Sequence, residues 1–141
     1  VAATKRLACT VKNLSNKKTY KFYVRAYKIV DGKKVSISKP VLIHVAMNDK
    51  KRTNVKAIRN VKKSYALNAG RKVGIRAGVV KENPEKKLLA HTAKFRYYSS
   101  DVSVAAVSRN GVITARQKGR CYIYVVTVNG VYKKIKVTVA G

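Results

Sequence analysis

The side chains that most often perform catalysis or bind metal ions are scarce in this chain of 141 residues. Only two cysteines, two histidines and five acidic residues occur. They are Cys9, Asp31, His44, Asp49, Glu82, Glu85, His91, Asp101 and Cys121. The cysteines and histidines lack the spacing of a zinc site, and the acids do not cluster as calcium ligands would. We therefore expect no metal ion and no cofactor.

Catalysis is not expected either. A serine–histidine–aspartate triad would have to use His44 or His91. We expect His44 to face solvent from the middle of a strand, and His91 to lie in an exposed basic loop. No carboxylates are paired for glycoside hydrolysis, and no Gly-rich phosphate-binding loop is present. The sequence thus predicts that the chain is not an enzyme.

The other reactive side chains have structural explanations. Glu82 and Glu85 share a lysine-rich loop that we expect to be solvated. Asp101 follows two serines at an expected turn, where it should accept backbone hydrogen bonds. Cys121 alternates with apolar residues and should be a small buried side chain. We expect no disulfide with Cys9, because the two cysteines lie in different parts of the chain.

The charge of the chain is extreme, because 33 lysines and arginines against 5 acids give a net charge of +28. One interpretation is a solvated, lysine-rich surface that keeps sheet edges from pairing wrongly. The other is attraction to a polyanion such as an acidic glycan, an anionic wall polymer or a nucleic acid. A nucleic acid is the less favoured partner, because no zinc motif, single-strand-binding motif or recognition helix is recognisable. No apolar run is long enough to predict a transmembrane helix.

Tyrosines and cations alternate with apolar residues on several expected strands, and this pattern predicts outward stripes that bind a polyanion or a glycan. The candidate contacts are Tyr23, Arg25, Tyr27, Lys94, Arg96, Tyr98, Tyr122, Tyr124, Lys134 and Lys136. Aromatic rings stack on sugar faces or bases, and cations hold acidic groups. The alternative is cross-strand packing of tyrosine rings against lysine and arginine stems, which stabilises a sheet without any ligand.

Short alternating segments separated by turn residues fill the chain, which is typical of an all-β protein. Residues 97–115 are the clearest case, with a Ser-Ser-Asp turn and a turn at Gly111 between apolar strands. The other expected strands lie within residues 7–14, 20–27, 35–45, 55–67, 73–79, 121–128 and 132–139. From about residue 55 onward, the strands should form two facing layers around one core. That core should enclose Phe95, Tyr97, Ile123 and Val137 together.

The order of motifs in this region resembles the signature of group 2 bacterial immunoglobulin-like domains. The matching residues are Tyr97, Ser99-Ser100-Asp101, Val104-Ala105-Ala106-Val107, Gly111-Val112-Ile113-Thr114-Ala115, Lys118-Gly119 and Ile123. The resemblance covers about residues 55–139, and Tyr97 replaces the tryptophan that is usual in the family. It implies an immunoglobulin-like β-sandwich. Such modules typically occur as tandem repeats in bacterial surface and secreted proteins, where they space or present adhesive parts.

The dipeptide Asn129-Gly130 is a strong hairpin signal. A two-residue turn would place Ile135 opposite Tyr124 and put the apolar faces out of step. We therefore predict a three-residue loop or a bulge near Gly130. That register would place Ile135 on the same face as Ile123.

The first segment resembles the final third of a fibronectin type III domain. The resemblance rests on Leu14, a five-residue loop and the alternating strand that begins at Tyr20. Tyr20 would occupy the tyrosine-corner position of that family. Because an incomplete sandwich cannot bury its inner face, we expect this segment to dock on the second module, to pair with another copy or to be poorly ordered. The chain begins at Val1 without an initiator methionine, and we expect it to be a piece of a longer polypeptide.

These inferences divide the chain into a partial fibronectin type III-like segment, a linker and a group 2 domain, at residues 1–47, 48–54 and 55–141. The predicted fold class is an all-β, immunoglobulin-like β-sandwich preceded by that partial set of strands. We expect a non-catalytic structural and adhesion module of a bacterial cell-surface or secreted multidomain protein. Its partners would be neighbouring modules of the same polypeptide and an anionic polysaccharide or bacterial wall polymer. A nucleic-acid-binding basic β-domain and an accessory module of a large surface hydrolase remain as alternatives.

Overall fold

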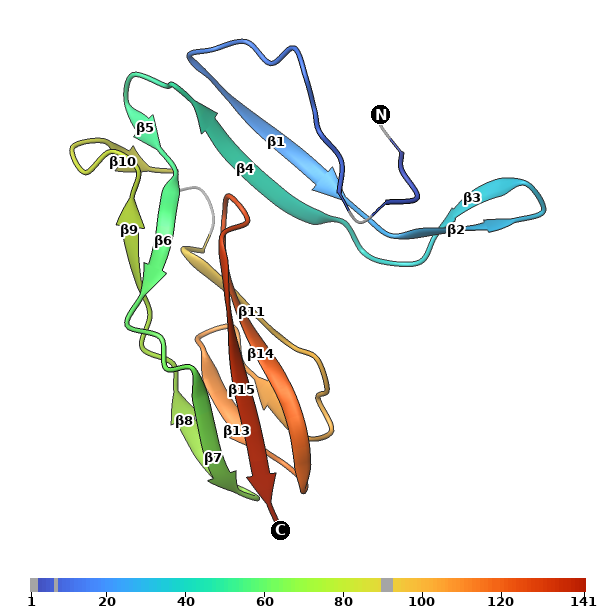
Figure 1. The fold of residues 1–141 in the computed structure, drawn as a ribbon, viewed down its shortest axis with the longest axis vertical. Coiled ribbons are helices and arrows are strands. Elements are labelled where there is room, and N and C mark those ends of the chain that lie inside the picture. The colour runs from blue at the N-terminus through green and yellow to red at the C-terminus, as the bar shows by residue number, and fades with distance from the viewer. Residues whose placement is uncertain (1–2, 7, 90–92) are drawn as a thin grey trace.

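The computed structural model describes residues 3–6, 8–89 and 93–141, and these residues form strands, turns and loops without any helix. Two parts can be distinguished in Figure 1: a two-stranded ribbon with a hairpin at its far end, and a two-layer β-sandwich. The all-β, immunoglobulin-like fold that the sequence predicts is confirmed.

One layer of the sandwich is a four-stranded sheet with the strand order β11-β14-β15-β7. Its neighbours pair antiparallel, except that β15 and β7 pair parallel. The bounds are Phe95–Ser99 for β11, Gly119–Thr127 for β14, Tyr132–Ala140 for β15 and Ser64–Asn68 for β7. Buried residues alternate with exposed or half-buried residues along β14, so one face of this sheet is covered and the other is open.

The opposite layer is a three-stranded antiparallel sheet with the order β12-β13-β8, at Ala105–Val107, Val112–Ala115 and Lys72–Gly74. An antiparallel pair, β6 with β9, continues on this side at Val55–Arg59 and Gly78–Lys81. Beyond it lies a short parallel pair, β5 with β10, at Arg52–Thr53 and Lys87–Leu88.

The core lies between the two layers, as the sequence predicts. Ile123 and Val137 are fully buried, and the rings of Phe95 and Tyr97 pack against the same cluster. The other layer contributes Ile113, Ala115 and Ala105. Apolar side chains that alternate along each strand therefore meet in one continuous core, which is the main stabilising contribution to a sandwich.

The β14–β15 hairpin has the predicted three-residue loop. The N–H of Thr127 donates to the carbonyl of Val131 at 2.9 Å, and the N–H of Gly130 donates to the carbonyl of Thr127 at 3.1 Å. Gly130 has a φ of 89°, the left-handed conformation that a glycine adopts at low cost. Ile123 consequently stands opposite Ile135, and the predicted register is confirmed.

Two strands that the sequence predicts as continuous are split. Residues 55–67 form β6 and then β7, with a left-handed Asn60 between them. Residues 73–79 form β8 and β9, with residues 75–77 outside any strand. The split has a topological reason, because the two halves of each segment pair with different strands.

The first segment consists of two antiparallel pairs. β1 (Lys18–Val24) pairs with β4 (Val41–Met47), and β2 (Tyr27–Val30) pairs with β3 (Lys33–Ser36) through a turn at Asp31-Gly32. The expected strand at residues 7–14 is wrong for residues 8–14, which form no strand and have no paired neighbour, while Leu7 lies outside the described residues. The Tyr20 hydroxyl accepts from the N–H of Ser15 at 2.8 Å, the contact that the tyrosine-corner position predicts.

β4 docks on the sandwich at its β14–β15 turn. The N–H of His44 donates to the carbonyl of Val128 at 2.9 Å, and Ile43 lies beside Gly130. The prediction that His44 faces solvent is wrong, because this docking leaves only 5% of the residue exposed. Of the three outcomes expected for the first segment, docking on the second module is therefore the one observed.

Candidate functional site

The outer face of the four-stranded sheet brings together tyrosines and cations from three strands. Alternate residues of β11, β14 and β15 point away from the core onto this face. We call its members the tyrosine face: Arg96, Tyr98, Arg120, Tyr122, Tyr124, Tyr132, Lys134 and Lys136. Six of the ten candidate residues from the sequence (Arg96, Tyr98, Tyr122, Tyr124, Lys134 and Lys136) thus share one surface, although they come from three separate segments.

Strand register sets the order of side chains on the tyrosine face. Tyr98 stands opposite Tyr124, which stands opposite Lys134, so one row crosses three strands. The next row contains Arg96 and Tyr132, which flank Val126. Side chains in one row lie about 5 Å apart, and neighbouring rows are separated by about 7 Å. The face is therefore a compact grid of rings and positive charges.

Several rings of this grid already contact one another or a cation. The Lys134 ammonium lies 4.3 Å from the centroid of the Tyr122 ring, a cation–π distance. The rings of Tyr124 and Tyr132 have centroids 6.2 Å apart and are tilted by 51°. Cross-strand packing, the alternative considered from sequence, thus accounts for part of the pattern. Tyr98 differs in its position, because it lies on the edge strand of the sheet, with 43% of its surface exposed.

A shallow groove lies beside Tyr98 along the free edge of β11. Its lining comes from both layers of the sandwich: Ala93, Phe95, Arg96, Tyr97, Tyr98, Arg109 and Asn110. Arg109 and Asn110 belong to the turn between β12 and β13, which the fold brings up to β11. Arg96 is anchored there, because its Nη2 donates to the carbonyl of Thr127 at 3.2 Å. The groove is therefore lined by two arginines and an exposed tyrosine.

The remaining candidate residues do not join this surface. Tyr23 and Tyr27 lie on β1 and β2 of the first segment, and Arg25 lies in the break between those strands. Tyr23 is 64% exposed, whereas the Tyr27 ring is half-buried with the Lys34 ammonium 5.7 Å from its centroid. Lys94 is exposed and immediately precedes β11.

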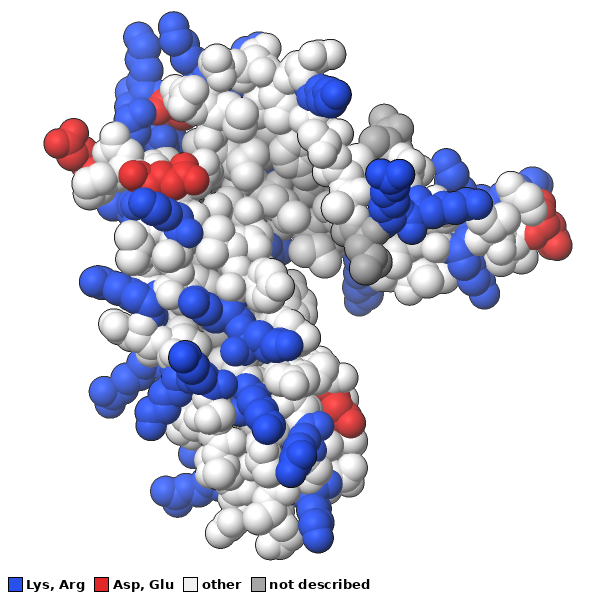
Figure 2. Space-filling view, in the orientation of Figure 1, with Lys and Arg blue, Asp and Glu red and all other residues white. Residues whose placement is uncertain are grey.

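The acidic residues lie in turns and loops, outside the strands that form the tyrosine face. They occupy the β2–β3 tip, the β4–β5 turn, the β9–β10 loop and the β11–β12 turn, at Asp31, Asp49, Glu82, Glu85 and Asp101. Figure 2 shows the result: lysine and arginine atoms spread over the sandwich, and the few acidic atoms gather at the periphery of the view. Because the view has the orientation of Figure 1, with β15 and β14 in front, the tyrosine face carries a positive potential.

Asp101 has the structural role that the sequence predicts. Its Oδ1 accepts from the Ser103 hydroxyl at 2.6 Å and from the Ser103 N–H at 2.9 Å. These hydrogen bonds, the hydroxyl first, hold the pKa of Asp101 below its ordinary value. The backbone N–H of Lys51 likewise lowers the pKa of Asp49, to whose Oδ1 it donates at 2.8 Å. Both carboxylates are therefore turn acceptors.

The other reactive groups form no metal-binding cluster among residues 3–6, 8–89 and 93–141. No three histidine, cysteine or acidic side chains in these ranges could hold a metal ion together. Cys121 is a free, buried cysteine, as predicted, and burial raises the pKa of its thiol. Burial also raises the pKa of the Tyr97 hydroxyl. His91 lies outside the described residues.

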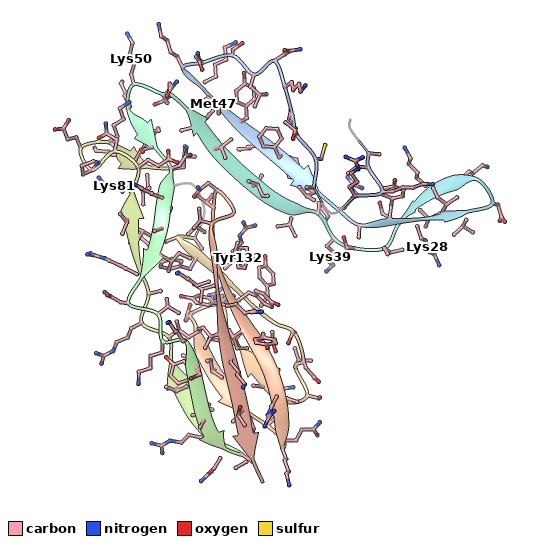
Figure 3. The ribbon with its side chains drawn as sticks, viewed as in Figure 1. Lys28, Lys39, Met47, Lys50, Lys81 and Tyr132 are labelled. Atoms are coloured by element: carbon pink, nitrogen blue, oxygen red, sulfur yellow. The ribbon has the colours of Figure 1, made fainter. Side chains whose placement is uncertain are left out.

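Sequence reasoning missed two members of the tyrosine face, Arg120 and Tyr132, and one residue of the groove, Arg109. Arg120 and Tyr132 follow from the same two-residue period that gave Tyr122 and Lys134, extended by one step in each strand. Figure 3 shows Tyr132 at the start of β15, at the end of the sandwich nearest β4. Arg109 carries no such signal, because it lies in a turn that reaches β11 only through the tertiary fold.

The fold and this surface define a class: a two-layer, immunoglobulin-like β-sandwich with a positively charged outer sheet face. The family model of the bacterial Ig-like domain (group 2) matches residues 55–139, which is more than half of the chain. The chain therefore belongs to the bacterial Ig-like domain (group 2) family.

Among solved structures, the chain is similar to the crystal structure of domains 4 and 5 of the S-layer protein SbsC. The TM-score is 0.51 at 15% sequence identity, and the alignment covers 77% of this chain and 63% of that chain. At this identity the similarity shows the fold alone. A comparison with curated protein sequences gives no match. The described residues contain no helix that is long and apolar enough to cross a membrane.

Proposed function

We propose that this chain is a non-catalytic structural module of a bacterial cell-surface or secreted multidomain protein, held to anionic glycans or wall polymers by its basic surface. Family membership supports the structural part of the proposal, since immunoglobulin-like sandwiches serve many proteins as spacers. The observation that carries the binding part is the charge distribution. A net charge of +28 is combined with a sheet face that has only cations and tyrosines among its charged and aromatic side chains.

A second feature supports a spacing role, because the two parts of the chain are joined by more than a linker. The side-chain amide of Asn54 accepts from the N–H of Ala46 at 2.8 Å and donates to its carbonyl at 2.9 Å. Asn54 thus acts as a strand partner for the end of β4, within the predicted linker, residues 48–54. A joint fixed by hydrogen bonds holds neighbouring parts at a set angle, which a flexible linker does not do.

Weak contacts suffice for such a module when several copies are arranged along one polypeptide. Each engaged module raises the effective concentration of the next one at the polymer, so avidity exceeds the affinity of a single module. Electrostatic attraction also raises the rate of association with an anionic surface. The proposed function therefore requires only modest affinity from each module.

The proposal is tested by retention on immobilised anionic polysaccharide and anionic wall polymer at about 0.15 M salt, where the Debye length is about 8 Å. We expect stronger retention than for a neutral protein of the same size. Equal retention of the two proteins would reject polyanion binding. A parallel salt titration with double-stranded DNA separates the nucleic-acid alternative, because phosphate binding gives a steep dependence of affinity on salt.

A further inference from the structure

The groove at the free edge of β11 differs from the rest of the positive surface in combining shape, charge and an open ring. Arg96 and Arg109 approach it from different layers of the sandwich, and Tyr98 forms part of its wall. Tyr98 has 43% of its surface exposed. A ligand bound there would lie beside two arginines and one exposed tyrosine.

The chemistry of these groups favours a ligand in which an anionic group is attached to a sugar ring. A guanidinium has a planar fork of N–H donors that matches the two oxygens of a carboxylate. Arg96 is already held by the carbonyl of Thr127, so little conformational entropy is lost when it binds. The phenol ring of Tyr98 offers a flat apolar surface against which the C–H face of a pyranose can pack. A sugar with a ring carboxylate satisfies both kinds of group.

The arrangement of the other tyrosines argues against a nucleic acid at this site. Binding of single strands relies on successive ring faces on which bases stack. The Tyr122 ring is covered by the Lys134 ammonium at 4.3 Å, and the Tyr124 and Tyr132 rings are tilted by 51° against each other. These rings therefore do not form a run of parallel stacking surfaces. A polymer of polyol phosphates fits less well too, because it brings no ring to Tyr98.

We propose that the groove between Arg96, Tyr98 and Arg109 binds a uronic-acid residue of an acidic polysaccharide, and that the polymer continues across the tyrosine face toward Lys134. This inference rests on the proposed function and deepens it by naming the ligand class and the site. The cations of the face, Lys134 and Lys136, would hold the neighbouring carboxylates of the polymer.

The test uses the whole chain and three probes: polygalacturonate, its methyl ester and inorganic polyphosphate. The ester keeps the rings without the charge, and polyphosphate keeps the charge without the rings. Binding is measured by calorimetry at about 0.15 M salt. Variants Tyr98→Ala and Arg109→Gln remove the ring and one guanidinium. Arg71→Gln is the matched control. Arg71 is also an exposed arginine in a turn, but it precedes β8 and does not line the groove.

We expect the wild type to bind polygalacturonate more tightly than polyphosphate, and the ester only weakly. Tyr98→Ala and Arg109→Gln should each lower the affinity for polygalacturonate about tenfold, the effect of losing one charge-assisted or stacking contact. Arg71→Gln should change it by less than about twofold. Thermal unfolding of each variant shows whether it is folded, and Arg109 is exposed, so its replacement should leave the fold intact.

Failure of this inference and failure of the proposed function give different results. If polygalacturonate and polyphosphate bind equally, and if Arg109→Gln and Arg71→Gln lose the same affinity, charge alone drives binding. The groove is then not a site. Wild-type affinity of Tyr98→Ala for polygalacturonate would overturn the inference as well. If the wild type binds neither polymer, the proposed function fails and the inference fails with it.

Discussion

The side-chain amide of Asn129 binds both backbone polar groups of Val55. Its Nδ2 donates to the Val55 carbonyl at 2.9 Å, and its Oδ1 accepts from the Val55 N–H at 3.3 Å. The contact joins the β14–β15 loop to the first residue of β6, which are 74 positions apart in the sequence. Val55 is only 2% exposed, so water has little access to its backbone groups. The asparagine therefore supplies the partners that this backbone would otherwise lack.

Replacement of Asn129 by alanine should lower the free energy of unfolding by about 1–3 kcal/mol, because two partly buried backbone groups lose their partners. Urea unfolding followed by circular dichroism measures the change. Asn68→Ala is the control, because Asn68 is exposed at the end of β7, and we expect a cost below about 0.5 kcal/mol. Equal costs for the two variants would show that the Asn129 contact does not contribute specifically.

Gly111 and Gly70 form a matched pair for testing core packing near Tyr97. Both have left-handed φ values, 78° and 81°, so alanine strains the backbone at either position. A Cβ on Gly111 would lie 2.7 Å from Cζ of Tyr97, whereas a Cβ on Gly70 would have no neighbour within 4 Å. We expect Gly70→Ala to cost about 1 kcal/mol and Gly111→Ala to cost about 1–3 kcal/mol more, because the half-buried Tyr97 ring, which packs against the core, must move. Chemical denaturation measures the loss of stability in both variants. A larger loss for Gly70→Ala than for Gly111→Ala would contradict the prediction.

Acid should weaken the turn between β11 and β12 through Asp101. Because the folded-state pKa of this carboxyl is held below its ordinary value of 3.8, its contribution to stability is present above pH 3.8 and is lost as the pH falls through the folded value. Ser103→Ala removes the hydroxyl that is the main cause of the lowered pKa. The variant should therefore show a smaller loss of thermal stability than the wild type between pH 4 and pH 2, about the range in which such a carboxylate titrates. An unchanged pH profile would disprove this coupling.

The two cysteines should react very differently with a thiol reagent. Cys9 is exposed, whereas Cys121 is 3% exposed within the core, where burial raises the pKa of its thiol. Since the thiolate is the reactive species, Cys121 should stay unmodified in the folded protein. Colorimetric titration should find one fast thiol in the native wild type and both thiols in denaturant. In Cys9→Ser the fast phase should vanish. A fast native reaction in that variant would contradict the burial of Cys121.

The sandwich could be predicted largely because it follows from a local pattern, the alternation of apolar and polar residues along each strand. Alternation assigned the inner faces of β14 and β15. Because Ile123 and Ile135 must share one face, a three-residue loop was required at Gly130. The breaks in residues 55–67 and 73–79 could not be found in this way, because the apolar pattern continues through them. Which strand each half pairs with depends on the assembled layers and not on the segment itself.

The site was predicted in part for the same reason. Register placed Tyr122 and Tyr124 beside Lys134, and the structure adds Tyr132 to them. The groove could not be predicted, because Arg109 reaches β11 only after the two layers have packed. The wrong expectation for His44 has a similar origin, since its burial depends on docking between two parts of the chain.

The parallel pairing of β7 with β15 gives the module a mechanical property. β7 lies near the start of the sandwich, and β15 is its last strand, so a pull on the two ends of the sandwich drags these neighbours in opposite directions along their length. Under such a load the strands are sheared along their length. The hydrogen bonds between them then bear the force together and do not break one after another. In a chain built from this unit, the β7–β15 pair would resist stretching until its hydrogen bonds break together.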